Sequence, residues 1–155
     1  MGSAELNSIA LKMVARKRGI LAADESSGTI KKRFDSINVE STTESRRQWR
    51  QLLFQTPDIG DYLSGVIMYD ETLRQSNDDG VRFVDLLAAS DILSGIKVDN
   101  SMQELAGSPN EFITKGLDGL EERLDEYCNL GARFAKWRAL LTIGDGRPSD
   151  HAIQT

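Results

Sequence analysis

GILAADESSG, residues 19–28, is the stretch that decides the fold class of this 155-residue chain. Its apolar part, residues 20–23, ends at Asp24 and Glu25, and Ser26, Ser27 and Gly28 follow. A short apolar run that ends in polar and turn-forming residues predicts a buried strand leading into a functional loop. The same arrangement recurs further along the chain, so the fold has to account for each of its copies.

Three later segments repeat this pattern. They are residues 64–69, which are followed by Asp70 and Glu71; residues 92–98, which are followed by Asp99 and Asn100; and residues 134–141. Helical periodicity separates the four runs. We expect an opening helix that ends near residue 18, with its apolar face at Leu6, Ile9, Ala10, Met13 and Val14, and further helices over residues 43–55, 81–89 and 117–130. In the helix over 43–55, Thr42 or Thr43 is the expected cap and Trp49, Leu52 and Leu53 form the expected apolar stripe, while Gly131 is the expected stop of the last helix.

Alternating strands and helices predict an α/β fold with a parallel sheet and right-handed crossovers. The polar residues gather at the carboxyl ends of the strands, which is where both a (β/α)8 barrel and an open flavodoxin-like sheet place their chemistry. A complete barrel needs about 250 residues and eight strands. With four strands expected, a complete barrel is excluded, and the pattern alone leaves a partial barrel and an open sheet as alternatives.

Composition narrows the class of function. The chain has 19 Lys and Arg against 24 Asp and Glu, a net charge of −5, which argues against a general nucleic-acid binder. Cys128 is the single cysteine, so an internal disulfide cannot form and a reducing compartment is expected. Neither a signal peptide nor a membrane span is recognisable. We therefore expect one cytoplasmic domain that does not bind membranes and holds no metal.

Two lysines, Lys97 and Lys136, lie inside apolar strand-like runs. An ammonium group there loses its hydration unless it meets an anion or faces a wet cavity. An internal ion pair, or a side chain that reaches to the rim, is the structural alternative to a catalytic role. A buried lysine beside a second cation can attack a carbonyl to form an imine, and a nearby carboxylate can move the protons. On this reasoning Lys136 is the candidate nucleophile and Asp24 the candidate carboxylate, although an acid after an apolar run is also a common cap or turn residue.

A phosphate site is the second candidate feature. Ser26 and Thr29 form a flexible hydroxyl-bearing loop with Lys31, Lys32 and Arg33 behind it, and Arg46 lies on the next expected helix. Hydroxyl groups and guanidinium groups are good phosphate ligands. A solvated loop and an exposed basic helix face explain the same residues without any function.

These residues resemble a known family, the class I, Schiff-base-forming fructose-bisphosphate aldolases. Residues 19–26 are similar to its signature strand and loop, residues 95–99 to its third strand and residues 134–138 to its fourth. Shorter matches at residues 46–53 and 117–123 lie between them, and the likeness runs from about residue 9 to residue 143. The resemblance implies a (β/α)8 TIM barrel. This chain is then expected to hold its first four β/α units, truncated, with residues 1–155 as the N-terminal part of a single barrel domain.

The resemblance also implies an activity, the reversible cleavage of fructose 1,6-bisphosphate to dihydroxyacetone phosphate and glyceraldehyde 3-phosphate in glycolysis and gluconeogenesis. It implies a lysine Schiff base, no metal, no organic cofactor and a homo-oligomeric intact enzyme. Asp24 matches the aspartate that works in proton transfer and C–C cleavage. Lys136 matches the lysine that assists the imine-forming one, which corrects its nomination as the nucleophile. The implied substrate-binding residues are Lys97 and Arg138 near the hydroxyls and phosphates, and Ser26, Thr29, Arg33 and Arg46 at a phosphate end. Thr29 stands where a serine is common.

In the family, the imine-forming lysine lies on the sixth strand, for which this chain has no counterpart. We expect the 155 residues alone to be inactive, as a fragment, a truncated product or one part of a split enzyme. The alternative is a catalytically dead half-barrel that acts as a binding or assembly module, and an open-sheet phosphate or nucleotide binder is the fallback at the level of the fold. In a half-barrel the strands at residues 20–23 and 134–141 would have open edges, and Val66, Ile96 and Ala135 are expected to point toward the interior.

Overall fold

A computed structural model describes residues 2–155 of the chain. Four strands form one parallel sheet in the order β1-β2-β3-β6, and a separate antiparallel hairpin pairs β4 with β5. The strands are β1 (Gly19–Ala23), β2 (Leu63–Met68), β3 (Leu93–Lys97), β4 (Met102–Glu104), β5 (Phe112–Thr114) and β6 (Phe134–Lys136). The sheet confirms the expected α/β class, with each predicted apolar run contributing one parallel strand.

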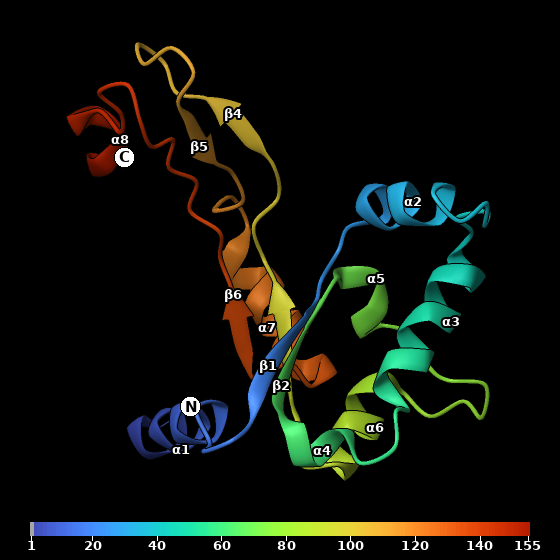
Figure 1. Ribbon diagram of the computed structural model, residues 1–155. Helices are drawn as coiled ribbons and strands as arrows, with labels where there is room; N and C mark the ends of the chain where they lie inside the picture. Colours follow the sequence, from blue (N-terminus) through green and yellow to red (C-terminus); the bar gives the residue numbers. More distant parts are fainter. Residues whose placement is uncertain (1) are drawn as a thin grey trace.

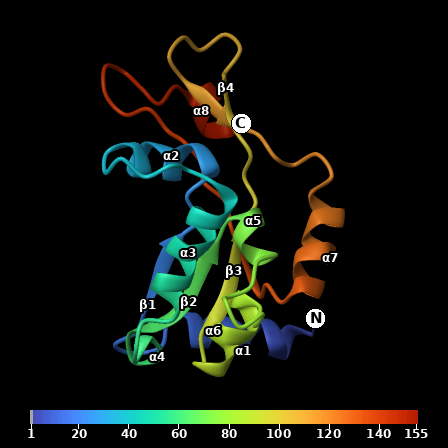
Figure 2. The ribbon, with the colours of Figure 1, turned by 90° about the vertical axis from the view of Figure 1, so that its right-hand side faces the viewer.

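Helices connect the strands and cover one face of the sheet. They are α1 (Ser3–Met13), α2 (Ser27–Asp35), α3 (Thr43–Phe54), α4 (Ile59–Tyr62), α5 (Asp70–Leu73), α6 (Phe83–Ala89), α7 (Leu120–Leu130) and α8 (Asp150–Gln154). Figure 1 shows α3, α5 and α6 on one side of the sheet, and Figure 2 looks onto these helices with the sheet behind them. In both views α1 lies at the amino ends of the strands, whereas α2, the β4–β5 hairpin and α8 lie beyond their carboxyl ends. The carboxyl edge is therefore the end of the sheet that carries the long connections.

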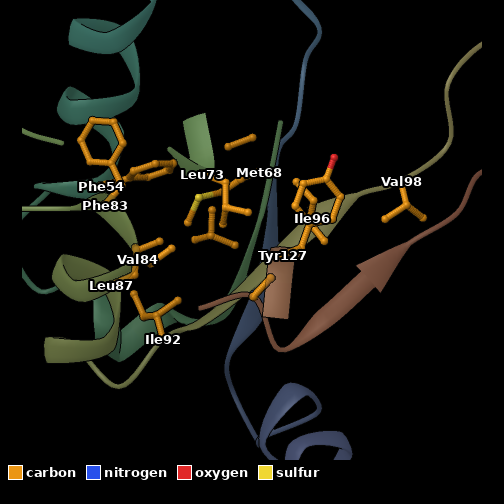
Figure 3. Close-up of a cluster of buried hydrophobic side chains, with 13 residues drawn as sticks. Phe54, Met68, Leu73, Phe83, Val84, Leu87, Ile92, Ile96, Val98 and Tyr127 are labelled. Atoms are coloured by element: carbon orange, nitrogen blue, oxygen red, sulfur yellow. The ribbon is translucent and has the colours of Figure 1, made fainter. Parts of the chain in front are cut away.

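The hydrophobic core lies between the sheet and this helical layer. Met68 and Ile96 from the strands pack with Phe54 from α3 and Phe83 from α6, as the close-up in Figure 3 shows. Val66 of β2 belongs to the same buried cluster. The rings of Phe54 and Phe83 meet edge to face with centroids 5.2 Å apart. This contact holds α3 against α6 on the covered face.

The expectation for Val66, Ile96 and Ala135 was wrong. Val66 and Ile96 are fully buried in the helix-covered core, and Ala135 is the register partner of Ile96, so all three side chains share that face. Side chains alternate along a strand, which means that the neighbouring positions point the other way. Those residues form the face that is called the open face below: Ile20, Ala22, Gly65, Ile67, Leu93, Gly95, Lys97, Phe134 and Lys136.

Phe134 fills the centre of the open face. A Cβ added at Gly65 would lie 3.2 Å from the Phe134 ring, and one added at Gly95 would overlap it. The two glycines on the neighbouring strands thus make room for one large ring. Sequence reasoning had assigned Phe134 only to an apolar run.

The fourth predicted strand is shorter than expected. Residues 134–141 were expected to be extended, but β6 ends at Lys136. It pairs with β3, which itself ends at Lys97, and one more bond follows from the Val98 backbone N–H to the Lys136 carbonyl at 3.1 Å. Because a strand is defined by its ladder of hydrogen bonds, β6 stops where its described neighbour stops.

The first helix and α3 differ from their expected bounds or faces. The opening helix ends at Met13 rather than near residue 18, and Lys17 has a left-handed φ of 67°. Its expected apolar face is poorly covered, since Leu6 is 56% and Val14 is 76% exposed. In α3 the cap is correct, because the Thr42 side chain accepts a bond from the Ser45 backbone N–H. Its expected stripe is correct only in part: Leu53 packs against the core and Trp49 against Phe34, whereas Leu52 is 66% exposed. The fully buried residues of α3 are Arg50 and Phe54.

Residues 26–29, expected to be a flexible loop, begin a helix instead. α2 starts at Ser27, and its Ile30 and Phe34, four residues apart, are both buried. Residues with this spacing lie on one face of a helix, so their burial fixes α2 in place. The last predicted helix, α7, begins three residues late at Leu120 and ends as expected at Leu130, where Gly131 follows with φ 116°. No helix among the described residues is both long and apolar enough to cross a membrane.

Candidate functional site at the carboxyl edge

The central contact of the candidate site joins the two outer strands of the sheet. Asp24 follows β1, Lys136 ends β6, and Lys136 Nζ donates to Asp24 Oδ2 at 2.6 Å. The two strands are three steps apart in the order β1-β2-β3-β6, which is about 14 Å in a flat sheet at the usual strand spacing. Side chains from opposite edges can meet over the open face because the sheet curls toward that face. The Asp24 side chain is 8% exposed and that of Lys136 is 34% exposed, so solvent can reach the lysine.

Lys97 lies beside this pair on the same face. It is the register partner of Lys136, so the two lysines occupy adjacent positions on neighbouring strands. Lys97 Nζ pairs with Asp99 Oδ2 at 2.8 Å and also donates to the Asp99 backbone carbonyl. Each lysine therefore has its own carboxylate, Asp24 for Lys136 and Asp99 for Lys97.

Glu25 organises the cations on the helical side of the edge. The buried Arg50 of α3 donates to Glu25 Oε2 at 2.6 Å and to its carbonyl at 3.0 Å, and Arg33 of α2 binds the other carboxylate oxygen. Burial would raise the pKa of the Glu25 carboxyl. The hydrogen bond from Arg50, with the charges of Arg50 and Arg33, outweighs that effect and holds the pKa below its ordinary value.

The predicted phosphate residues lie around this edge, but only some of them contact one another. The Ser26 and Thr29 hydroxyls are 3.2 Å apart at the start of α2. Arg33 is 57% exposed and bound to Glu25. Arg46 of α3 forms a two-pronged bond with Glu71, with Nε at 2.8 Å and Nη2 at 2.7 Å from its oxygens. Each guanidinium is thus held by the acid that follows a neighbouring strand.

Arg138 is the predicted site residue with the fewest contacts. It lies two residues past β6, its side chain is exposed, and its backbone carbonyl accepts a bond from the Thr114 hydroxyl at 2.7 Å. That bond ties the segment after β6 to strand β5 of the hairpin. Within residues 2–155, the structure does not bring Arg138 into the ion pairs described above.

Sequence reasoning missed Glu25, Arg50 and Asp99. Glu25 directly follows the assigned Asp24, and Asp99 lies two residues after the assigned Lys97, so their position after apolar runs was a usable signal. Arg50 gave no such signal, because an arginine within a charged helix is normally exposed. Only the fold shows that its guanidinium is buried against the loop after β1.

A curled parallel sheet whose carboxyl edge carries paired lysines and carboxylates belongs to the α/β proteins that assemble their chemistry at the ends of parallel strands. Comparison with known proteins makes the class specific. The family model described as "Glycolytic: Fructose-bisphosphate aldolase class-I" matches residues 5–155. The chain therefore belongs to the class I fructose-bisphosphate aldolase family, as the resemblance indicated.

Individual relatives agree with this assignment. A probable fructose-bisphosphate aldolase class 1 from Xanthomonas axonopodis pv. citri is 51% identical over 154 residues, which cover 99% of this chain and 46% of the relative. The cytosolic fructose-bisphosphate aldolase 6 of Arabidopsis thaliana is 56% identical over 136 residues, covering 88% and 38%. The chain thus spans less than half the length of these relatives.

A solved structure shows the same fold. It is fructose-bisphosphate aldolase from Plasmodium falciparum, in a ternary crystal with TRAP and a small-molecule inhibitor. The two chains superpose with a TM-score of 0.94 and are 49% identical in sequence. The match covers 97% of this chain and 44% of the Plasmodium chain. The arrangement of strands and helices described here is therefore that of the family over the shared part.

Proposed function

We propose that this chain is the N-terminal part of an enzyme that reversibly cleaves fructose 1,6-bisphosphate to dihydroxyacetone phosphate and glyceraldehyde 3-phosphate. Residues 1–155 supply the first four β/α units of one (β/α)8 barrel domain, with β1, β2, β3 and β6 as its first four strands. The imine-forming lysine comes from a later strand, outside these residues. Family membership and the coverage of less than half of each relative support this proposal.

The single observation that carries the proposal is the Asp24–Lys136 pair across the open face. Consider a carbonyl compound held there as an iminium, with a hydroxyl group two carbons from the iminium carbon. When a base removes the proton of that hydroxyl, the C–C bond between the hydroxyl-bearing carbon and its neighbour breaks. The electron pair of that bond then passes to the iminium. Asp24 is the base that we assign to this proton. Lys136 is the cation that binds Asp24 and holds it close to the reacting atoms.

Substrate binding is assigned to the cations and hydroxyls around the same edge. A bisphosphate carries negative charge at both ends, and guanidinium, ammonium and hydroxyl groups bind phosphate oxygens well. Glu25 and Glu71 hold Arg33 and Arg46 in place for this purpose. The proposed substrate-binding residues are Ser26, Thr29, Arg33, Arg46, Lys97 and Arg138. The proposed reaction uses no metal ion and no organic cofactor.

The proposed cellular location is taken from the relatives. Two Arabidopsis relatives are named as cytosolic aldolases, and we assign this protein to the cytosol on that basis. A homo-oligomeric complete enzyme is part of the same proposal.

A chimera tests the proposed function. Residues 1–155 are joined to the C-terminal part of the Xanthomonas axonopodis relative, beginning after the position aligned with Thr155. The chimera should cleave fructose 1,6-bisphosphate, and Asp24→Asn, which keeps the shape and removes the base, should lower turnover by about 100-fold or more. A folded chimera without cleavage, or an Asp24→Asn variant with full turnover, would contradict the proposal.

A second candidate function is a binding or assembly module without catalysis. One observation favours it: Ile20 is 40% exposed, and β1 and β6 each pair on one side only within the described residues. Open strand edges are sites of association. Isolated residues 1–155 that form a defined complex, while the chimera shows no turnover, would favour this module over the enzyme.

A further inference from the structure

Asp99 is a buried carboxylate outside the proposed reaction, and its partner is Lys97. It follows β3 by two residues, and its side chain is 2% exposed. One oxygen, Oδ2, pairs with Lys97 Nζ at 2.8 Å, and the backbone carbonyl of Asp99 accepts a second bond from the same ammonium. Lys97 is therefore held against the end of its own strand by one residue.

The other carboxylate oxygen is unusual. Asp99 Oδ1 is buried and has no hydrogen-bond partner among the described residues. Burying an ionised oxygen without a donor costs free energy, so stability of this segment alone is a poor explanation for an aspartate here. The pair with Lys97 is the interaction that the residue makes at this cost.

The backbone around Asp99 is fixed from two sides. The Asn100 backbone N–H donates to the Lys115 carbonyl at 2.9 Å, and the Lys115 N–H donates to the Ser101 carbonyl at 2.8 Å. Arg123 of α7 donates to the Val98 carbonyl at 3.1 Å and also to the Gly116 carbonyl. The carboxylate is thus presented by a rigid loop, which suits a residue that must hold another side chain in one place.

Lys97 needs such a partner because of where it lies. It is the register partner of Lys136, and both side chains project from the same face. The carboxylate that binds its neighbour Lys136 is Asp24, so a Lys97 released by Asp99 would lie beside a lysine that already holds the proposed base. Two ammonium groups competing for one carboxylate would disturb the base that the proposed reaction uses.

We propose that Asp99 is a positioning residue that holds Lys97 for the substrate and keeps it away from Asp24. This inference rests on the proposed function, in which Lys97 binds substrate. It assigns Asp99 an indirect role, through Lys97, and no contact with the reacting atoms.

Two readouts on the chimera test this role. In steady-state kinetics, Asp99→Asn should raise KM for fructose 1,6-bisphosphate by about tenfold, the usual size of a lost charged hydrogen bond, and lower kcat by less. In acetylation by limiting acetic anhydride, followed by peptide mass spectrometry, the same variant should label Lys97 several times faster than the unmutated chimera does. Labelling of Lys136 should change much less.

Asp118→Asn is the matched control, because Asp118 is an exposed acid in the loop before α7. Asp99→Glu keeps the charge and should recover most of the protection of Lys97, which also serves if Asp99→Asn folds poorly. Unchanged Lys97 labelling in Asp99→Asn would overturn the proposal, as would equal increases at Lys97 and Lys136. An unmutated chimera without turnover contradicts the proposed function instead, and the labelling still decides the role of Asp99.

Discussion

Lys136→Ala in the chimera separates a catalytic pair from a structural one. The substitution removes the ammonium that binds Asp24 at 2.6 Å and leaves a carboxylate that is 8% exposed without that partner. Breaking a fully buried ion pair costs about 3–5 kcal/mol of stability, whereas exposed pairs contribute about 1 kcal/mol or less. Because the Lys136 side chain is 34% exposed, water can replace part of the lost interaction, and we expect a loss of about 2 kcal/mol.

The expected loss of activity is larger. Lys136 holds Asp24, the base of the proposed reaction, in place, and proton transfer by a positioned group contributes about 100-fold to 10,000-fold to a rate, which corresponds to about 3–5 kcal/mol of transition-state stabilisation. A domain with ordinary stability of about 5–15 kcal/mol remains almost entirely folded after losing about 2 kcal/mol. Unfolding therefore cannot account for a 100-fold fall in kcat.

The assay compares kcat with the free energy of unfolding in urea for the same preparations. Lys115→Ala is the control, since Lys115 is an exposed lysine of the hairpin whose recorded bonds use only its backbone. If Lys136→Ala lowers stability and activity in proportion, the ion pair is structural and the assignment of Lys136 is wrong. The reasoning would also fail if kcat changed by less than about fivefold at full stability.

Three further predictions concern packing, pH and association. Gly95→Ala in the chimera should cost about 1–3 kcal/mol in urea unfolding, because the new Cβ would overlap the Phe134 ring. The folded pKa of Glu25 lies below the ordinary value of 4.5, so its bonds with Arg50 stabilise the protein above that pH and are lost as the pH falls through the folded pKa. The free energy of unfolding, measured from pH 7 to pH 3, should therefore fall less steeply for Glu25→Gln than for the unmutated chimera. Isolated residues 1–155 should self-associate or unfold without a cooperative transition, because β1 and β6 carry open edges, and sedimentation with calorimetry measures this.

Controls and contrary outcomes are specific to each of these. Gly28→Ala should be tolerated, since nothing lies within 4 Å of its added Cβ, and equal losses at Gly28 and Gly95 would refute the packing argument. The control for Glu25→Gln is Glu104→Gln on the exposed strand β4, which should lose stability below pH 5 as steeply as the unmutated chimera does. A Glu25→Gln curve parallel to that of the unmutated protein would show that the Arg50 pair contributes nothing to the pH dependence. A monodisperse, cooperatively melting monomer of residues 1–155 would show that four units form a stable domain.

Much of the fold could be predicted because the strands carry strong local signals. The apolar runs at β1, β2 and β3 are short and are followed by acids, and in the structure a strand overlaps each of them. The orientation of their side chains was not predictable in the same way. β2 is apolar or small throughout, and so is β3 up to its last residue, Lys97, so the pattern does not alternate, and Val66 and Ile96 were placed on the wrong face.

The β4–β5 hairpin and the length of β6 were also outside the reach of the sequence. The hairpin strands have three residues each, which is too short to show a period. Their pairing, with Met102 opposite Thr114, is visible only in the structure. β6 ends early because its length depends on β3, a strand about 40 residues earlier in the chain. Such non-local causes leave no mark on the local pattern.

For the candidate site, the sequence predicted some of the residues but not the contacts between them. Asp24, Lys97 and Lys136 could be nominated because charged residues beside or inside apolar strands are uncommon and costly. Their pairing could not, since it depends on the curl of the sheet that brings β1 and β6 within reach across the open face. The buried Arg50 was hidden for another reason, because its partner is partly a backbone carbonyl, Glu25 O.

The most direct test of the central claim is borohydride trapping with dihydroxyacetone phosphate, followed by peptide mapping of the adduct. In the chimera, the account predicts a stoichiometric adduct on a lysine of the C-terminal part, with Lys97 and Lys136 unlabelled. Isolated residues 1–155 should give little or no adduct. Substantial labelling of Lys136 in either protein would contradict the claim that this segment supplies the base and the assisting lysine while the imine forms elsewhere.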